Sequence, residues 1–85
     1  MQEFSHTIAD PSGIHARPAG LLAQKMQAFK STVTLNRDGQ SADAKKLIAM
    51  MKLRPKCGQI IVVRAEGEDE EEAIKAAQDF LRENL

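Results

Sequence analysis

The alternation of hydrophobic and polar residues along this chain predicts four β-strands. Residues 4–8 and 32–36 alternate between the two classes, which is typical of strands with one buried face. The Asp-Gly pair at 38–39 favours the positive backbone angles of a tight hairpin turn, so residues 40–43 should pair antiparallel with the preceding strand. Residues 59–65 are hydrophobic on both faces, which indicates a central place in a sheet.

Three other segments are predicted to be helices, the first and the last of them from the hydrophobic period of a helix. The first should begin near His15 and run to about Phe29, and the apolar segment Leu47–Leu53 predicts a short second helix. The last should begin at Asp69, whose carboxylate would cap it while Glu72 reaches back to the chain before it. The buried stripes of the first and last helices comprise Ala19, Leu22, Met26 and Phe29, and Ile74, Ala77 and Leu81.

The order β-α-β-β-α-β-α predicts an α+β fold in which helices cover one face of a single sheet. The 85 residues suit one domain, 1–85, and contain no repeat, linker or low-complexity tract. We therefore expect a single core.

The sequence Gly13-Ile14-His15-Ala16-Arg17-Pro18-Ala19 predicts an anion site. Pro18 lacks a backbone N–H and is tolerated only in the first turn of a helix, so His15 should lie at or just before the helix start. Backbone N–H groups at a helix start point outward without partners, and the helix dipole favours negative charge there. Arg17 adds a permanently charged donor that can bind an anion with two hydrogen bonds.

A histidine at this position can do more than cap a helix. Neutral imidazole is a nucleophile, and a phosphoryl group received by His15 would bring a charge of about −1.5 to −2 toward the amides of Ala16 and Arg17. The plainer alternative is that His15 only caps the helix and Arg17 is a solvated surface charge. The arginine and the first-turn proline together favour a site that carries phosphate covalently.

Composition excludes several other function classes. Net charge is zero, with 12 basic and 12 acidic residues, and three phenylalanines are the only aromatic side chains, which argues against nucleic-acid binding. Cys57 stands alone, so there is no intrachain disulfide, and no Cys/His spacing predicts a metal site. Neither a basic leader followed by an apolar run nor a stretch of membrane-spanning length is present, so we expect a cytoplasmic protein that does not insert into membranes.

The string GIHARPA at residues 13–19 resembles the phosphorylation motif of HPr, the histidine-containing phosphocarrier family of the bacterial phosphotransferase system. Further landmarks match in register along essentially the whole chain: the hairpin at 38–39, the apolar helix at 45–53, Gly58 and the Ala-Glu-Gly sequence at 65–67. The resemblance implies an open-faced two-layer sandwich, with a four-stranded antiparallel sheet in the order 1-4-2-3 and three helices on one face.

The resemblance also implies a function. His15 would accept a phosphoryl group from phosphorylated enzyme I, through the ring nitrogen nearer the backbone, and pass it to the IIA domains of sugar permeases during phosphoenolpyruvate-dependent sugar uptake. Arg17 and the backbone amides of Ala16 and Arg17 would stabilise the phosphoryl group. Such a protein is a monomeric carrier that needs no cofactor or metal and turns over no small substrate by itself.

The short helix is hydrophobic nearly all round, although a helix on a sheet buries only one stripe. Met50 and Leu53 could face the core, which leaves other apolar residues exposed, and exposed apolar patches mark partner sites. By the resemblance the docking residues are Leu47, Ile48 and Met51, with Gly20 and Gln24 on the first helix as weaker candidates.

The chain departs from the family at a few positions. Lys46 stands where many members carry a regulatory serine, so that phosphorylation site is absent, and nothing marks Ser41 as its substitute. Gly20 replaces a common alanine, which loosens a helix by roughly 1 kcal/mol. Arg54 replaces a helix-ending glycine, so we expect Pro55 to end the helix with an extended residue before it.

Two other functions remain open from the sequence. A regulatory binding module could use the same docking face without carrying phosphate, or act in a phosphotransfer pathway unrelated to sugar. The order of elements also resembles that of RNA-recognition folds, but the balanced charge and missing sheet aromatics argue against RNA.

Overall fold

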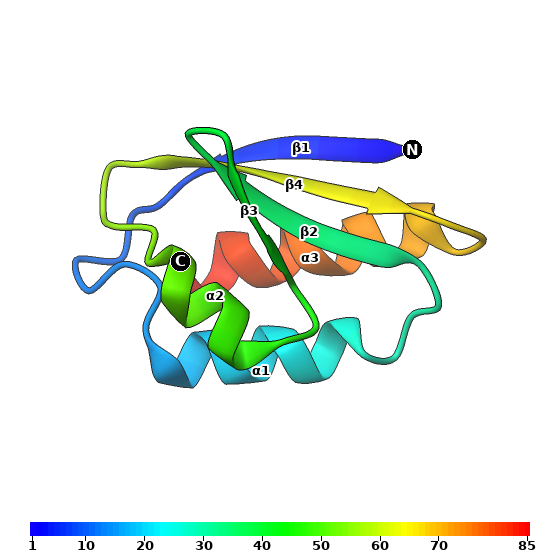
Figure 1. Cartoon of the computed structure of the whole chain (residues 1–85), viewed down its shortest axis with the longest axis horizontal. Helices are drawn as coiled ribbons and strands as arrows, with labels where there is room; N and C mark the ends of the chain where they lie inside the picture. The colour runs from blue at the N-terminus through cyan, green and yellow to red at the C-terminus, as the bar shows by residue number, and fades with distance from the viewer.

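The computed structural model describes residues 1–85 and has the predicted order of elements. The strands are β1 (Gln2–Thr7), β2 (Thr32–Arg37), β3 (Gln40–Asp43) and β4 (Ile60–Glu66), and the helices are α1 (Ala16–Met26), α2 (Leu47–Leu53) and α3 (Glu70–Asn84). The strands form one layer and the helices form a second layer on one face of it (Figure 1). The predicted α+β sandwich is confirmed.

The four-stranded sheet has the order β1-β4-β2-β3, and every neighbouring pair is antiparallel. The hairpin between β2 and β3 turns at Asp38 and Gly39, whose φ angles are 50° and 83°, as predicted for a tight turn. The sheet order implied by the family resemblance and the central place of β4 are both confirmed.

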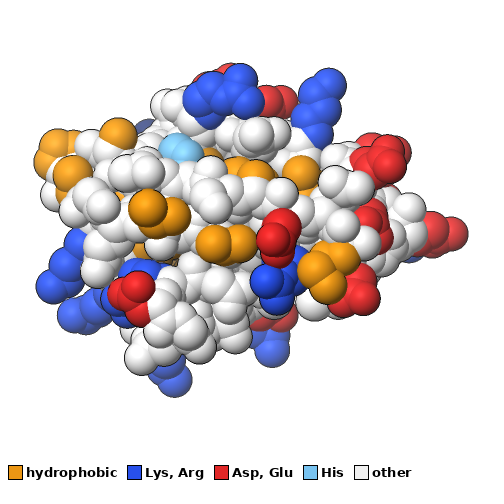
Figure 2. Space-filling model, turned by 90° about the horizontal axis from the view of Figure 1, so that it is seen from above, with side chains coloured by type: hydrophobic (Ala, Val, Ile, Leu, Met, Phe, Trp, Pro, Cys, Tyr) orange, Lys and Arg blue, Asp and Glu red, His pale blue; other side chains and the backbone are white.

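Only one face of β4 is covered, although the strand is hydrophobic on both. Ile61 and Val63 are fully buried against the helices, whereas Ile60 on the opposite face is 58% exposed. On the open side of the sheet, hydrophobic side chains lie among polar and charged ones (Figure 2). A central strand position therefore does not require that both faces be covered.

The core lies between the sheet and the helices, and the buried stripes of α1 and α3 fill it as predicted. Its largest fully buried side chains are Ile8, Leu22, Met26, Leu35, Met50, Ile61 and Leu81. Burying such side chains stabilises a fold by about 1.5–3 kcal/mol each. Ile74, predicted in the stripe of α3, is only partly buried and packs at its margin.

Helix α1 ends at Met26, three residues before the predicted end. The N–H of Ala28 donates to the carbonyl of Lys25 at 3.3 Å, and that of Phe29 donates to the carbonyl of Met26 at 3.1 Å. These bonds span three residues instead of four, which is the tighter turn that often ends a helix. Phe29 still packs against the core from this turn.

The predicted capping box at the start of α3 is wrong. The Asp69 carboxylate makes no capping bond. It accepts the hydroxyl and N–H of Ser31 and, at 2.9 Å, the N–H of Lys30. Glu70, not Glu72, reaches back and accepts the Gly67 N–H at 3.2 Å. The bonds from Ser31 and Lys30, the Ser31 hydroxyl above all, lower the pKa of Asp69 to about 2.

Helix α2 ends at Leu53 as predicted, but the extended conformation expected for the next residue is wrong. Arg54 is left-handed, with φ 47° and ψ 57°, and its N–H donates to the carbonyl of Met50 at 3.2 Å. Arg37 donates from its guanidinium to the carbonyl of Leu53 at 2.8 Å. These bonds satisfy carbonyls at the helix end. The left-handed residue is followed by the buried Pro55, whose carbonyl accepts the N–H of Ile14 at 2.9 Å.

Candidate functional site

The loop before α1 is held rigidly against the loop after α2. Gly13 has a φ of 66°, and its N–H donates to the carbonyl of Asp10 at 2.8 Å. The next residue, Ile14, is buried and donates its N–H to the carbonyl of Pro55 at 2.9 Å. A Cβ atom at Gly13 would lie 2.5 Å from that same carbonyl oxygen. Only glycine fits this approach, which fixes the position of His15.

His15 is the residue that precedes the first turn of α1, as the sequence predicted. Its backbone is extended and its carbonyl accepts the N–H of Ala19 at 3.0 Å, while its side chain caps nothing. Neither Ala16 nor Arg17 donates its N–H to another group in the chain, and Pro18 has none to donate. Two free amides therefore remain at the helix start, where the dipole favours an anion.

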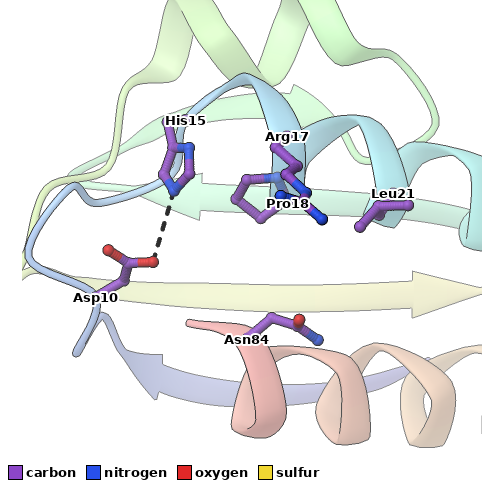
Figure 3. Close-up of a pocket in the computed structure, with 6 residues that line it drawn as sticks. All are labelled: Asp10, His15, Arg17, Pro18, Leu21 and Asn84. Carbon is purple, nitrogen blue, oxygen red and sulfur yellow. Dashed lines mark ion pairs between the residues drawn. The ribbon is translucent and has the colours of Figure 1, made fainter.

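The imidazole of His15 and the side chain of Arg17 line one open cavity of about 240 Å³. Figure 3 shows its lining residues, which are Asp10, His15, Arg17, Pro18, Leu21 and Asn84. The His15 side chain is 45% exposed, so its ring is accessible from solvent. Arg17 is exposed and makes no ion pair, so its guanidinium is free to bind an anion.

Asp10 is a site residue that sequence reasoning missed. Its Oδ2 lies 3.6 Å from Nε2 of His15, and the dashed line in Figure 3 joins the two groups. The sequence assigns Asp10 only to the turn that ends the first strand, and no motif spacing links it to His15. The fold alone brings the carboxylate to the ring.

The site has the elements needed to hold a phosphoryl group on a histidine. It provides an accessible nucleophile, two unpaired amides at a helix start and an unpaired guanidinium. A family model described as "PTS HPr component phosphorylation site" matches residues 2–83.

The chain belongs to the HPr family.

Its similarity to individual HPr proteins extends over nearly the whole chain. It is 40% identical to the phosphocarrier protein HPr of Mycoplasma genitalium, across 99% of this chain and 97% of that protein. A solved histidine-containing phosphocarrier protein of Mycoplasma superposes with a TM-score of 0.94 at 32% identity, covering 96% of this chain and 93% of the other. HPr from Thermoanaerobacter tengcongensis gives a TM-score of 0.91 at 38% identity, covering 96% and 92%. Membership of the HPr family assigns the chain a phosphocarrier role in the phosphotransferase system, as distinct from enzymatic turnover.

The predicted HPr docking residues divide by exposure. Met50 and Leu53 are buried as expected, while Ile48 projects from α2 and is 65% exposed. Three other candidates, Leu47, Met51 and Gly20, are half-buried. Gln24 is exposed, but its side chain is polar. Their role in docking stays a prediction.

Leu21 is an exposed apolar residue that the sequence reasoning did not select. It lies on α1, lines the cavity beside Arg17 and is 48% exposed. The sequence did contain a signal for this position, because Leu21 is an apolar residue outside the buried stripe of α1. It also follows Arg17 by four residues, which places both on the same face of the helix. Leu21 thus provides an exposed apolar side chain in the same cavity as His15.

Lys46 immediately precedes α2, at the position where many HPr proteins have serine. Its side chain is exposed and makes no capping bond. The lysine side chain has no hydroxyl that could be phosphorylated. It also has no oxygen that could accept hydrogen bonds from the free N–H groups of the first turn. The chain thus has no hydroxyl acceptor at this position.

Proposed function

We propose that this protein accepts a phosphoryl group on His15 from phosphorylated enzyme I and passes it to the IIA domains of sugar permeases in phosphoenolpyruvate-dependent sugar uptake. One observation supports this most: the accessible ring of His15 shares a cavity with an unpaired guanidinium, next to two free amides at a helix start. These groups are complementary to a phosphoryl group attached to the ring.

The proposed transfer needs little chemistry from the carrier itself. The Nδ1 lone pair of neutral His15 attacks phosphorus, and the bond from phosphorus to the donor breaks with its electron pair. The phosphoryl oxygens then accept hydrogen bonds from the amides of Ala16 and Arg17, while the Arg17 guanidinium offsets their charge. Positioning and electrostatic stabilisation dominate phosphoryl transfer, and the partner protein completes the site.

The apolar surface around the site supports docking of a partner over His15. Ile48 on α2 and Leu21 on α1 are both exposed. Gln27, just after α1, donates to the carbonyl of Lys45, which lies shortly before α2, at 2.9 Å. A partner seated on both helices would cover the cavity and exclude water from the transferring group. We place these encounters in the cytoplasm, where an exposed free thiol such as that of Cys57 stays reduced.

The proposal is tested by following labelled phosphate from phosphoenolpyruvate through enzyme I to this protein and on to an isolated IIA domain. The His15→Ala variant should block both steps. The Arg17→Ala variant should fold normally and slow transfer about tenfold, because one charge-assisted contact is lost. Arg64→Ala is the matched control, since Arg64 is also exposed but pairs with Glu3 on the sheet, away from the site.

The regulatory alternative predicts a different result. A binding module would bind enzyme I or another partner through α1 and α2, yet label would never appear on the IIA domain. Transfer that persists in His15→Ala, or an Arg17→Ala rate equal to that of Arg64→Ala, would contradict the proposed roles of these residues.

A further inference from the structure

Asp10 is held by three hydrogen bonds that leave one carboxylate oxygen free. Its N–H donates to the carbonyl of Leu85 at 3.2 Å, and its own carbonyl accepts the N–H of Gly13 at 2.8 Å. Oδ1 accepts the N–H of Ser12 at 2.8 Å. Oδ2 is the oxygen that faces Nε2 of His15, at 3.6 Å. The carboxylate is thus aimed at the ring by the loop itself.

A carboxylate beside one ring nitrogen selects between the two forms of a neutral histidine. Neutral imidazole carries a single proton, on either Nδ1 or Nε2, and an ionised carboxylate can only accept a hydrogen bond. Asp10 therefore favours the form with the proton on Nε2, which leaves a lone pair on Nδ1. Figure 3 shows the other ring nitrogen on the side of the ring away from Asp10, toward the start of α1.

We propose that Asp10 is a positioning residue for phosphoryl transfer, which holds the Nε2 proton of His15 so that Nδ1 is the nucleophile. This inference rests on the proposed function. The Nδ1 lone pair forms the bond to phosphorus, the donor's leaving atom departs with its electron pair, and the Nε2 proton stays on the ring. The ring gains positive charge as that bond forms. The negative Asp10 carboxylate, on the side of the ring away from the phosphorus, stabilises this charge.

The two carboxylate oxygens of Asp10 have different partners, the Ser12 N–H and the His15 ring, so Asp10→Asn can change one contact and keep the other. The amide oxygen of asparagine can still accept the Ser12 N–H and keep the turn, so the NH₂ group replaces Oδ2 beside the ring. An NH₂ group donates a hydrogen bond and favours a lone pair on Nε2, which moves the proton to Nδ1 and blocks the nucleophile. The variant therefore reverses the preference while it preserves the fold of the loop.

The first readout is ¹⁵N NMR of the free protein, which distinguishes the two ring forms without any partner. The chain has two histidines, so the spectrum of His15→Ala identifies the signal of His6. We expect the wild type to favour the Nε2–H form and Asp10→Asn to favour the Nδ1–H form. A second variant, Asp10→Ser, keeps a turn acceptor without the carboxylate and should give intermediate proportions.

The second readout is the initial rate of phosphorylation by enzyme I. Because both partners are partly exposed, Asp10→Asn should slow this rate about two- to fivefold. Asp79→Asn removes the same charge from an exposed site where Asp79 pairs only with Arg82, and it should leave ring form and rate unchanged.

Each outcome decides one question. A shift in ring form together with a slower rate supports the role of Asp10. Equal proportions of the ring forms in wild type and both variants, or a shifted ring form with an unchanged rate, overturns it. Absence of phosphorylation in the wild type would instead defeat the proposed function, and the NMR result, which needs no enzyme I, keeps the two failures distinct.

Discussion

Substitution of Gly13 by alanine tests whether the close contact between the two loops positions His15. Two separate terms oppose the alanine. A residue with a Cβ in the left-handed region, at φ 66°, costs roughly 1–2 kcal/mol. The new Cβ would also lie 2.5 Å from the Pro55 carbonyl oxygen and 2.9 Å from Cα of Lys56, so the backbone must move.

That movement breaks an existing contact. The Pro55 carbonyl accepts the N–H of Ile14, and the net stabilisation from such a bond is about 0.5–1.5 kcal/mol. Ile14 and Pro55 are both buried, so separating them also loosens their packing. The sum predicts that Gly13→Ala lowers the free energy of unfolding by about 2–4 kcal/mol, a large part of the total stability of a small domain.

Urea unfolding measures this loss, and Gly39→Ala supplies the control. Gly39 has a φ of 83° but no atom within 4 Å of its added Cβ, so its variant shows the backbone term alone, roughly 1–2 kcal/mol. The additional loss of unfolding free energy in Gly13→Ala, compared with Gly39→Ala, then measures the contact between the loops. Phosphorylation by enzyme I should also be slower in Gly13→Ala. Equal losses in the two variants would refute the reasoning that this approach fixes the site.

Three further predictions concern the ends of the helices. Arg54→Gly relieves a left-handed arginine at φ 47° and should raise the free energy of unfolding by about 1 kcal/mol; an unchanged urea midpoint would count against the strain. Lys46→Ser supplies a capping oxygen to α2 and should also add about 1 kcal/mol in the same assay, whereas a loss would contradict the capping argument. The lowered pKa of Asp69, about 2 against an ordinary 3.8, contributes stability that is complete above pH 3.8 and declines as the pH falls toward 2. Ser31→Ala should flatten this decline in acid unfolding curves, and an equally steep decline would show that the Ser31 hydroxyl is not its cause.

The fold was predictable because its signals are local and repeated. Alternation over residues 4–8 and 32–36, the turn at 38–39 and the hydrophobic stripe of α1 each reflect which side chains face the core. The failures occurred where a distant group competes with a local rule. Asp69 follows the sequence pattern of a helix cap, but Ser31, 38 residues away, offers its carboxylate better-placed donors.

The site was predictable to the extent that it depends on one short motif. His15, Arg17 and the first-turn proline are close in sequence, so helix geometry alone places them together. Asp10 was missed because its approach to the ring depends on how the loop folds back after Gly13. Arg54 was misjudged because the local preference of a residue before proline does not include the distant contact of the next residue, where the carbonyl of the buried Pro55 accepts the N–H of Ile14.

The central claim is that His15 carries the phosphoryl group, and intact-mass spectrometry with fragment-ion localisation tests it most directly. After incubation with enzyme I and phosphoenolpyruvate, the wild type should gain the mass of one acid-labile phosphoryl group, located on His15, and His15→Ala should gain none. A phosphoryl group located on any other residue, or the same mass gain in His15→Ala, would contradict the account.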